Sequence, residues 1–391
     1  MTKFVWKRPP KSEIVIFDGF ATQGIISAIN EQSYSIFENR HSKLHVWTLF
    51  HMLTRLRFSW LDYCVSYLIL SGARVVVTCI DSNPLFYRLK HHLPQVRFIA
   101  IQNGIRGTGS PVQGGDFWSA LDAFGTRPPH VDIVATFGTA HSEQYSAQIR
   151  CVTVEIGSTR SNSIPIQKKL NISHSPRIAL ISNFSGLPHQ DIFPGGAAST
   201  TAMYLREQRI AASDYFAADA RVANFISNIC SRNKWEFSIV ARRDQTFTHE
   251  QRFFADACAD NKFSFIVKQS ETSAYEYLDG VDLVVAIDST LGYEMIARGT
   301  RVIFISARAA LLGGEGSRQF KFGFPGNHPE EGAFWTESLH QSEIEKLMHS
   351  VLALSEDGWK HCSEFVSREL MSYDSDNGLF RNLLDTSRNV S

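Results

Sequence analysis

Short apolar runs that are rich in β-branched residues and end at turn residues recur along the whole chain. Five lie in its first part, at residues 14–17, 75–79, 98–101, 133–137 and 152–156. Five more follow, at residues 178–181, 237–240, 263–267, 283–287 and 302–305. Helices cover both faces of a parallel sheet, so its strands are apolar throughout. The pattern therefore predicts ten buried parallel strands.

Between these runs, apolar positions recur at the spacing of amphipathic helices. Such segments span residues 44–70, 83–91, 212–233, 249–259, 290–297 and 342–354. Strands that alternate with helices are typical of Rossmann-like sheets. We therefore predict the α/β class, with two Rossmann-like domains facing a central cleft.

The chain turns polar between residues 158 and 175, where Ser, Thr, Asn and Lys dominate. At 391 residues it also exceeds the length at which a single hydrophobic core usually keeps growing. A linker is predicted in this stretch, which divides the chain into domains of residues 1–170 and 171–391. Ligands of such sheets bind at the carboxyl ends of the strands, so the candidate residues are sought there.

Composition excludes some classes of protein. The 39 basic and 39 acidic side chains balance, so no bulk attraction to nucleic acid is expected. The six cysteines contain no CxxC pair, as in a reducing compartment. The basic residues 1–10 are not followed by the apolar run of a signal peptide. These features predict a cytoplasmic location.

The segment of residues 44–70 is the longest apolar-rich stretch. Arg55, Arg57 and Asp62 interrupt it, so it lacks the roughly 20 apolar residues of a membrane span. Its aromatic residues and arginines suit a helix at a lipid interface, but aromatic side chains are more often buried. Core packing is the favoured interpretation, and peripheral contact with the inner face of the inner membrane is the alternative.

The most informative motif is at residues 288–294, where a strand passes through a hydroxyl pair into a helix. Ser289 or Thr290 can cap this helix, whose free N–H groups and dipole attract phosphate. Gly292 would let a ligand approach closely, and Glu294 could accept hydrogen bonds from ribose hydroxyls. The alternative is an ordinary capped helix with an exposed Glu.

A second motif directly follows the apolar run at residues 178–181. Its loop holds His189 and Asp191, and either could serve as nucleophile, base or acid at a sugar carbon. The alternative is structural, because Asp is common in turns rich in Pro and Gly, where its side chain bonds nearby backbone.

Two strand ends of the first domain carry further candidates. Gln102, Asn103 and Gly104 could bind an acceptor or complete the donor site, but Asn-Gly is also a strong turn former. Asp18 could act as a base or simply cap a helix.

In the second domain, Arg242 and Arg243 follow the run at residues 237–240. A planar guanidinium there would suit a carboxylate or phosphate, although paired arginines are also common on surfaces. The histidines form no HExxH motif, and we expect neither a metal nor another cofactor.

Together these stretches resemble bacterial surface-carbohydrate and capsular-polysaccharide glycosyltransferases of GT-B architecture, especially the retaining β-Kdo transferases that use CMP-Kdo. The similarity lies at residues 101–104, 137–138, 156–158 and 288–294, and in the loop of Asp191. It departs at Ala241-Arg242-Arg243-Asp244, where related capsule enzymes often carry a His-Pro pair.

The resemblance implies a glycosyltransferase of surface-polysaccharide synthesis, such as lipopolysaccharide, O-antigen or capsule. It implies an acceptor side in residues 1–170 and a nucleotide-sugar side in residues 171–391. It assigns CMP binding to Ser289, Thr290, Gly292 and Glu294, and the nucleophile that forms a covalent sugar adduct to Asp191. The acceptor would be a glycan or a lipid-linked glycan.

Asp18 and His189 are the candidates for the acid or base that activates the acceptor. Three other functions remain open. The chain could use a UDP-, GDP- or CMP-sialic acid donor, it could be a sugar-nucleotide 2-epimerase of the same architecture, or it could be a two-lobed binding protein without catalysis.

Overall fold

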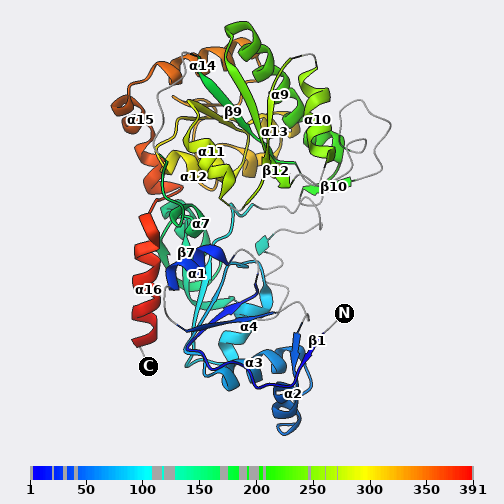
Figure 1. Cartoon of the computed structure of the whole chain (residues 1–391), viewed down its shortest axis with the longest axis vertical. Helices are drawn as coiled ribbons and strands as arrows, with labels where there is room; N and C mark the ends of the chain where they lie inside the picture. The colour runs from blue at the N-terminus through cyan, green and yellow to red at the C-terminus, as the bar shows by residue number, and fades with distance from the viewer. Residues whose placement is uncertain are drawn as a thin grey trace. The chain divides into compact units, whose positions relative to one another are not determined.

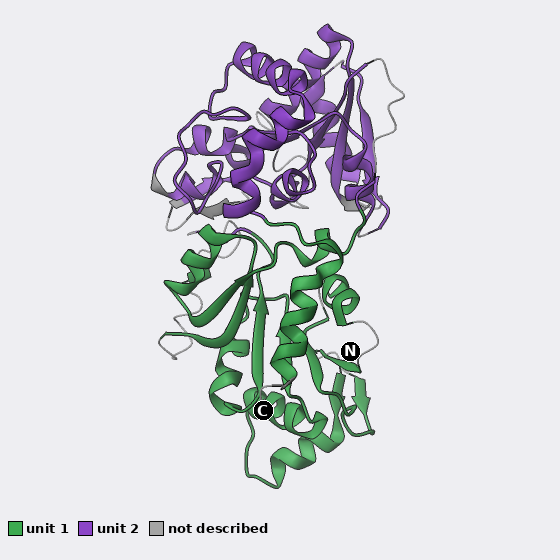
Figure 2. Cartoon of the chain, turned by 90° about the vertical axis from the view of Figure 1, so that its left-hand side faces the viewer, with its two compact units in different colours: residues 1–104, 117–165, 372–391 green, residues 105–116, 166–371 purple. Residues whose placement is uncertain are grey.

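The computed structural model forms two compact units (Figures 1 and 2). Unit 1 comprises residues 1–104, 117–165 and 372–391, and unit 2 comprises residues 105–116 and 166–371. The structure describes residues 3–19, 22–29, 33–38, 43–107, 117–118, 128–167, 175–184, 192, 202–205, 208–244, 248–259, 261–270 and 272–389.

Unit 1 is built on a parallel six-stranded sheet in the order β3-β2-β5-β6-β7-β8. Its strands are β2 (Ile14–Phe17), β3 (Tyr34–Phe37), β5 (Val75–Thr78), β6 (Arg97–Ile101), β7 (His130–Thr136) and β8 (Arg150–Glu155). A separate parallel pair joins β1 (Lys3–Val5) to β4 (Lys43–His45). The helices are α1 (Gln23–Ile29), α2 (Val46–Leu53), α3 (Trp60–Ser71), α4 (Pro84–His92), α6 (Thr139–Ser146), α7 (Thr159–Asn162) and α16 (Gly378–Asn389), with a 3-10 turn η2 (Ser375–Asn377).

Unit 2 repeats this plan with a parallel sheet in the order β13-β12-β9-β14-β15-β16. Its strands are β9 (Arg177–Ile181), β12 (Glu236–Asp244), β13 (Ser264–Lys268), β14 (Leu283–Ala286), β15 (Val302–Ile305) and β16 (Trp335–Thr336), beside the antiparallel pair β10 (Ala202–Leu205) and β11 (Gln208–Ala211). The helices are α9 (Ala212–Asn233), α10 (Thr248–Cys258), α11 (Ser273–Asp279), α12 (Thr290–Ala297), α13 (Ala307–Leu312), α14 (Gln341–Ala353) and α15 (Glu356–Glu369), with a 3-10 segment η1 (Glu315–Phe320).

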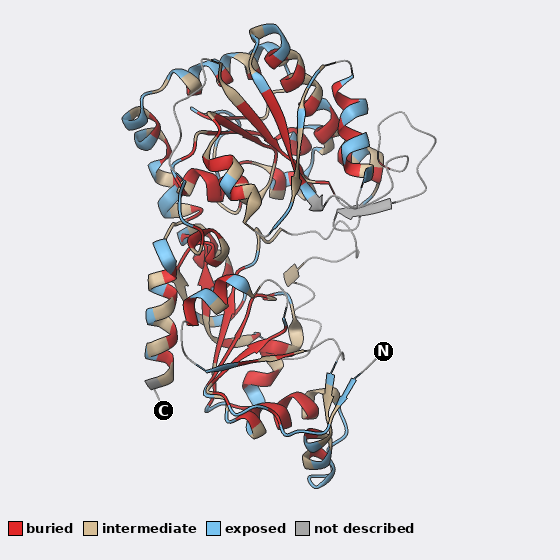
Figure 3. Ribbon diagram, viewed as in Figure 1, coloured by how far each residue is buried: buried red, intermediate tan, exposed pale blue. Residues whose placement is uncertain are grey.

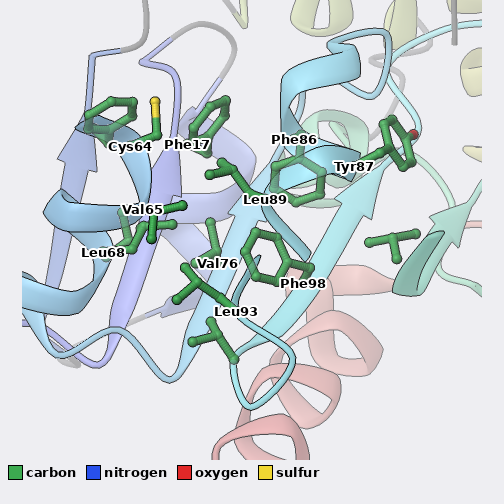
Figure 4. Close-up of a cluster of buried hydrophobic side chains, with 14 of the residues drawn as sticks. Phe17, Cys64, Val65, Leu68, Val76, Phe86, Tyr87, Leu89, Leu93 and Phe98 are labelled. Carbon is green, nitrogen blue, oxygen red and sulfur yellow. The ribbon is translucent and has the colours of Figure 1, made fainter. Parts of the chain in front are cut away.

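Both sheets are covered on both faces, as the apolar strand pattern requires. In β5, Val76 belongs to the core under α3 and α4, whereas Val75 and Val77 belong to the core on the opposite face. Figure 4 shows the first of these cores, where Phe86 and Phe98 pack edge to face at 5.3 Å between ring centroids. Burial of the strands is plain in Figure 3. The predicted class and all ten predicted strands are confirmed.

The prediction of a single helix over residues 44–70 is wrong. The segment contains the end of β4, then α2, a turn and α3. Ser59 begins α3 with a capping box, in which its hydroxyl accepts from the Asp62 N–H and the Asp62 carboxylate accepts from the Ser59 N–H. Leu56 in the turn has a φ of 53°, which a continuous helix does not allow. Within the described part of the chain, no helix combines the length and apolarity that crossing a membrane requires.

The predicted linker also begins too early. Residues 158–163 form α7 and its caps, and Asn162 is buried, with its side-chain amide donating to the Ile156 carbonyl at 2.8 Å. The transition between the units falls after Pro165. The polar composition of this stretch therefore did not mark a linker, because its side chains bond to backbone groups inside unit 1, as the Ser163 hydroxyl does to the Arg160 carbonyl at 2.8 Å.

The C-terminal segment does not follow the predicted boundaries, because residues 372–391 belong to unit 1 rather than to unit 2. Phe380 and Leu384 of α16 are buried in the core that contains the β2 side chains. Ser372 donates from its N–H to the Phe137 carbonyl at 2.8 Å. Gly157, at a φ of 72°, has no room for a Cβ because the Ser372 carbonyl oxygen would lie 2.0 Å away.

Candidate functional site

The strand order reverses once in each sheet, and that position is where open α/β sheets bind ligands. In unit 1 the chain leaves β2 toward β3 on one side and then returns to β5 on the other. In unit 2 it leaves β9 toward β12 and later returns to β14. The residues just beyond β2 and β5, and beyond β9 and β14, are therefore the first places to examine.

In unit 2, the side chains of Asn183 and Asp288 meet at this position. The pairing of β14 with β9 sets Leu283 beside Ile178 and Val285 beside Leu180. When this register is continued past the ends of the two strands, Asn183 lies opposite Asp288. The Asn183 Nδ2 donates a hydrogen bond to the Asp288 Oδ1, which closes the gap between the two strand ends.

The second oxygen of Asp288 binds Arg308, which lies in α13 directly after β15. Arg308 Nε donates to Asp288 Oδ2 at 2.7 Å, and its Nη2 donates to Asp219 Oδ2 of α9 at 2.8 Å. A further nitrogen donates to the Tyr215 carbonyl, and the guanidinium carbon lies 4.0 Å from the centre of the Tyr215 ring. One arginine thus joins α9, α13 and the end of β14.

The charged side chains of this cluster are largely shielded from solvent. The side chains of Arg308, Asp219 and Asp288 are 0%, 2% and 12% exposed. Burial raises the pKa of Asp219, although the nearby Arg308 opposes that rise. The two carboxylates raise the pKa of Arg308 despite the opposing effect of its burial, so its charge is permanent. Burial also raises the pKa of Tyr215 to about 12.

Next to Asp288, the N-terminus of α12 is open. Ser289 is the N-cap residue, but its side chain makes no capping hydrogen bond. Ser289 and Thr290 are both partly exposed. The first N–H groups of a helix have no partner within the helix and carry partial positive charge. Ser289 therefore occupies the predicted N-cap position, but its side chain does not make the predicted capping hydrogen bond. This helix end is left suited to an anionic ligand.

The two other residues of this motif face inward. A Cβ on Gly292 would lie 2.7 Å from both Ala286 Cβ and Phe304 Cζ, so this glycine permits close packing of α12 on its own sheet. Glu294 is buried, and its Oε2 accepts a hydrogen bond from the Tyr275 hydroxyl at 2.8 Å. The expectation that Gly292 gives a ligand room is replaced by a packing role, and Glu294 is not an exposed helix residue.

Arg242 lies at the end of β12, beside the Asn183–Asp288 pair. Its side chain is exposed, with Nη1 donating to the Asn183 carbonyl at 3.3 Å, while its backbone N–H donates to the buried Glu250 carboxylate at 2.8 Å. The predicted residues His189 and Asp191, and the side chain of Arg243, lie outside the described residues.

In unit 1, Asp18 occupies the position where the strand order reverses. It follows β2, is 5% exposed, and has a φ of 79° that non-glycine residues seldom adopt. Its N–H donates to the Phe37 carbonyl at 2.9 Å, which ties it to β3. Such left-handed backbone costs on the order of 1 kcal/mol or more and is often found at functional sites.

Gln102 is internally satisfied. Its side-chain oxygen accepts from the Phe137 N–H at 2.9 Å, and its Nε2 donates to the Gly104 carbonyl and to His141 Nδ1, each at 3.1 Å. Burial lowers the pKa of His141 to about 3, so this histidine is neutral and carries its proton on Nε2. Gln102 therefore joins β6, β7 and α6, while Asn103 is exposed and available to a ligand.

Four residues of the unit 2 cluster were not singled out from the sequence, namely Asp288, Arg308, Asp219 and Asn183. Arg308 stands three residues after an apolar strand, and Asn183 stands two residues after another. A polar residue just after a strand was the signal used for Asp18, so both could have been found. Asp219 carried no such signal, because it lies within the long helix α9. Among the described residues, no group of three or more His, Cys, Asp or Glu side chains is placed to hold a metal ion.

Replacement of Arg308 by Met should cost about 3–5 kcal/mol in the free energy of unfolding, because Asp219 and Asp288 would lose their buried counter-charge. Chemical denaturation would measure the loss. Arg232→Met is the matched control, since Arg232 pairs with Glu345 at 2.8 Å on the surface, and it should cost less than about 1 kcal/mol. A similar small loss in both variants would contradict the role given to Arg308.

Replacement of Gly292 by Ala should cost about 1–3 kcal/mol, because the added methyl group would overlap Ala286 and Phe304. Gly104→Ala is the control, since a Cβ at Gly104 would meet nothing within 4 Å. Urea unfolding of both variants would test the packing role. If Gly292→Ala were as stable as the unsubstituted protein, there would be open space beside Gly292, and the packing role would be wrong.

Solved structures of low sequence identity share the fold. The sucrose-phosphate synthase of Thermosynechococcus elongatus matches with a TM-score of 0.55 and 11% identity, over 97% of this chain and 100% of its own. The wall teichoic acid polymerase TagF, as its H444N variant with CDPG, matches with a TM-score of 0.53 and 10% identity, over 97% and 90% of the two chains. A structure from Listeria monocytogenes assigned as a UDP-N-acetylglucosamine 2-epimerase matches with a TM-score of 0.53 and 10% identity, over 96% and 95%.

These likenesses confirm the predicted α/β fold class of GT-B type with two sheet domains. A search of curated protein sequences gave no match. A family described as "putative O-antigen biosynthesis protein" matches residues 99–388, about three quarters of the chain, which include most of β6, all of β7 and β8 of unit 1, and the whole sheet of unit 2. By this match, the chain belongs to that family of O-antigen biosynthesis proteins.

Proposed function

We propose that the protein is a glycosyltransferase of O-antigen or related surface-polysaccharide synthesis, with a nucleotide-sugar donor bound by unit 2. The open N-terminus of α12 beside the Asn183–Asp288 pair is the observation that carries this proposal. It offers a helix N-terminus without a side-chain cap at the point where the strand order reverses, which suits the phosphate of a nucleotide. Family membership supplies the polysaccharide context.

In this proposal Ser289 and Thr290 contact the donor phosphate directly, since both are partly exposed. By the resemblance, Glu294 accepts hydrogen bonds from the ribose, and the Tyr275 hydroxyl orients its carboxylate. Asp288 does not touch the donor. Its two oxygens are used by Asn183 and Arg308, so it holds the strand end that presents α12.

The donor that we propose is CMP-Kdo. Support comes from the resemblance of residues 288–294 to the CMP-binding motif of β-Kdo transferases. Kdo also carries a carboxylate at its anomeric carbon, and the exposed guanidinium of Arg242 beside Asn183 suits such a group. The acceptor is a glycan, free or lipid-linked, that binds at unit 1.

The proposed reaction has two displacements. The Asp191 carboxylate attacks the anomeric carbon as the bond to CMP breaks, and CMP leaves with the bonding electrons. The acceptor hydroxyl then attacks the same carbon, loses its proton to a base, and displaces Asp191, so the configuration is retained. Asp18 or His189 is the proposed base. The strained backbone of Asp18 at its strand end supports it for this role.

A second candidate is a sugar-nucleotide 2-epimerase, which the fold shared with the Listeria structure favours. An epimerase needs no acceptor. Formation of an epimerised nucleotide sugar by the protein alone would therefore select this function over transfer.

The nucleotide preference can be measured as a shift in the melting temperature. CMP should stabilise the protein more than UDP, GDP or CDP, because a ligand that binds only the folded state raises its stability by mass action, by about 2.7 kcal/mol at a hundredfold excess over Kd. A selective shift with UDP or GDP would remove the Kdo assignment and retain the transferase. No shift with any nucleotide would contradict a donor site in unit 2.

Asp191→Ala should abolish transfer while CMP binding stays close to that of the unsubstituted protein, because only the nucleophile is removed. Transfer would be followed with CMP-Kdo and a glycan acceptor, and CMP binding by calorimetry. Asp214→Ala is a suitable control, as a substitution of an Asp in the first turn of α9. Normal transfer by Asp191→Ala would exclude the covalent mechanism.

A further inference from the structure

One end of unit 1 carries large apolar side chains in contact with solvent. Seven of the thirteen exposed large apolar residues in the described part of the chain lie within residues 3–11 and 43–59, which we call the apolar knob. The knob therefore exposes far more apolar surface than its length predicts. Its seven residues, with their exposed fractions, are Phe4 (56%), Trp6 (77%), Trp47 (43%), Phe50 (58%), Leu53 (55%), Leu56 (82%) and Phe58 (72%).

The knob is one folded surface. β1 pairs with β4, which leads directly into α2, so the N-terminal strand lies beside this helix (Figure 1). The guanidinium of Arg8 lies 4.8 Å from the centre of the Trp47 ring, and Trp47 meets Phe50 edge to face. On its inner side, α2 buries Thr48 and Met52 against unit 1. Trp47, Phe50 and Leu53 thus lie on a helix whose other side is already packed, and the remaining exposed apolar side chains come from the N-terminal strand region and the turn after α2.

The charge of the knob has a single sign. It contains seven Lys and Arg residues and no Asp or Glu, although the whole chain has a net charge of zero. Two of the seven have acidic neighbours outside the knob, since Lys43 lies 4.0 Å from Glu38 and Arg57 lies 3.5 Å from Asp62. The seven basic residues are Lys3, Lys7, Arg8, Lys11, Lys43, Arg55 and Arg57.

We propose that the apolar knob docks the protein on an anionic lipid surface. Aromatic and leucine side chains insert at the boundary between headgroups and acyl chains, while Lys and Arg around them attract lipid phosphate. Tryptophan in particular favours this boundary, because its ring is apolar and its N–H is polar. A protein partner would supply specific acidic groups, whereas a lipid surface needs only the mixture of apolar and basic side chains found here.

The knob lies next to the proposed acceptor side of the enzyme. Lys43 pairs with Glu38 just beyond β3, and the Glu38 carboxylate would be 3.2 Å from a Cβ on Gly19, which follows Asp18. Docking would therefore bring the strand ends of unit 1 near the membrane. If the proposed function is correct, this placement favours the lipid-linked form of the glycan acceptor. The docking itself does not depend on that function.

Flotation of the purified chain with vesicles tests the docking. Binding to vesicles of phosphatidylcholine mixed with phosphatidylglycerol should be strong at low salt and should fall as salt rises. The triple variant Phe50→Ser, Leu56→Ser, Phe58→Ser should lose at least about tenfold in affinity, because it removes buried apolar area at the interface. Lys7→Glu with Arg55→Glu should weaken binding to the mixed vesicles selectively.

The matched control is Val152→Ser with Leu379→Ser, which removes exposed apolar side chains elsewhere on unit 1 and should leave vesicle binding unchanged. Melting temperatures equal to that of the unsubstituted protein would show that every variant is folded. Unchanged binding by the triple variant would overturn the proposal. Self-association that the triple variant abolishes, without any vesicle binding, would also overturn it and identify a contact between copies. Neither result bears on sugar transfer, because the assay contains no donor or acceptor.

Discussion

The buried positive charge of Arg308 is the interaction on which the proposed donor site depends. A lone guanidinium in a protein interior costs several kcal/mol, so its position is fixed by the groups that compensate it. Here those groups come from three separate parts of unit 2, the helix α9, the end of β14 and, through Asp288, the end of β9. The strand ends therefore hold the Arg308 guanidinium in place, and the guanidinium in turn holds the strand ends and α9 together.

The two units apply the same sheet topology with different local chemistry. In unit 2 the reversal of strand order is bridged by polar side chains, and the adjoining helix end is left open. In unit 1 the corresponding place holds Asp18 in left-handed backbone, and Gln102 closes the neighbouring strand ends with internal hydrogen bonds. The open helix end of unit 2 suits the proposed donor side. The constrained carboxylate of Asp18 in unit 1 suits the proposed acceptor side.

Much of the fold could be predicted because strands buried on both faces leave an unmistakable apolar run. β3 escaped notice because it lies at an edge and alternates in burial, and β16 is only two residues long. The segment of residues 44–70 misled because apolar residues continue through the short turn between its two helices, where Leu56 and Phe58 are exposed. Asp18 and Ser289 lie at strand ends, as expected from the sequence, and their roles stay predictions. Asp219 gave no such signal, because its role depends on a contact 89 residues away in sequence.

The C-terminal helix α16 has a consequence for how the chain is made. Phe380 and Leu384 complete a core whose other strands and helices are encoded before residue 165. During synthesis, domains usually fold in order from the N-terminus. Unit 1 cannot follow that order, because its hydrophobic core stays open on one face until all of unit 2 has been translated. A fragment of residues 1–165 would expose the same face, so unit 2 is a better candidate than unit 1 for production on its own.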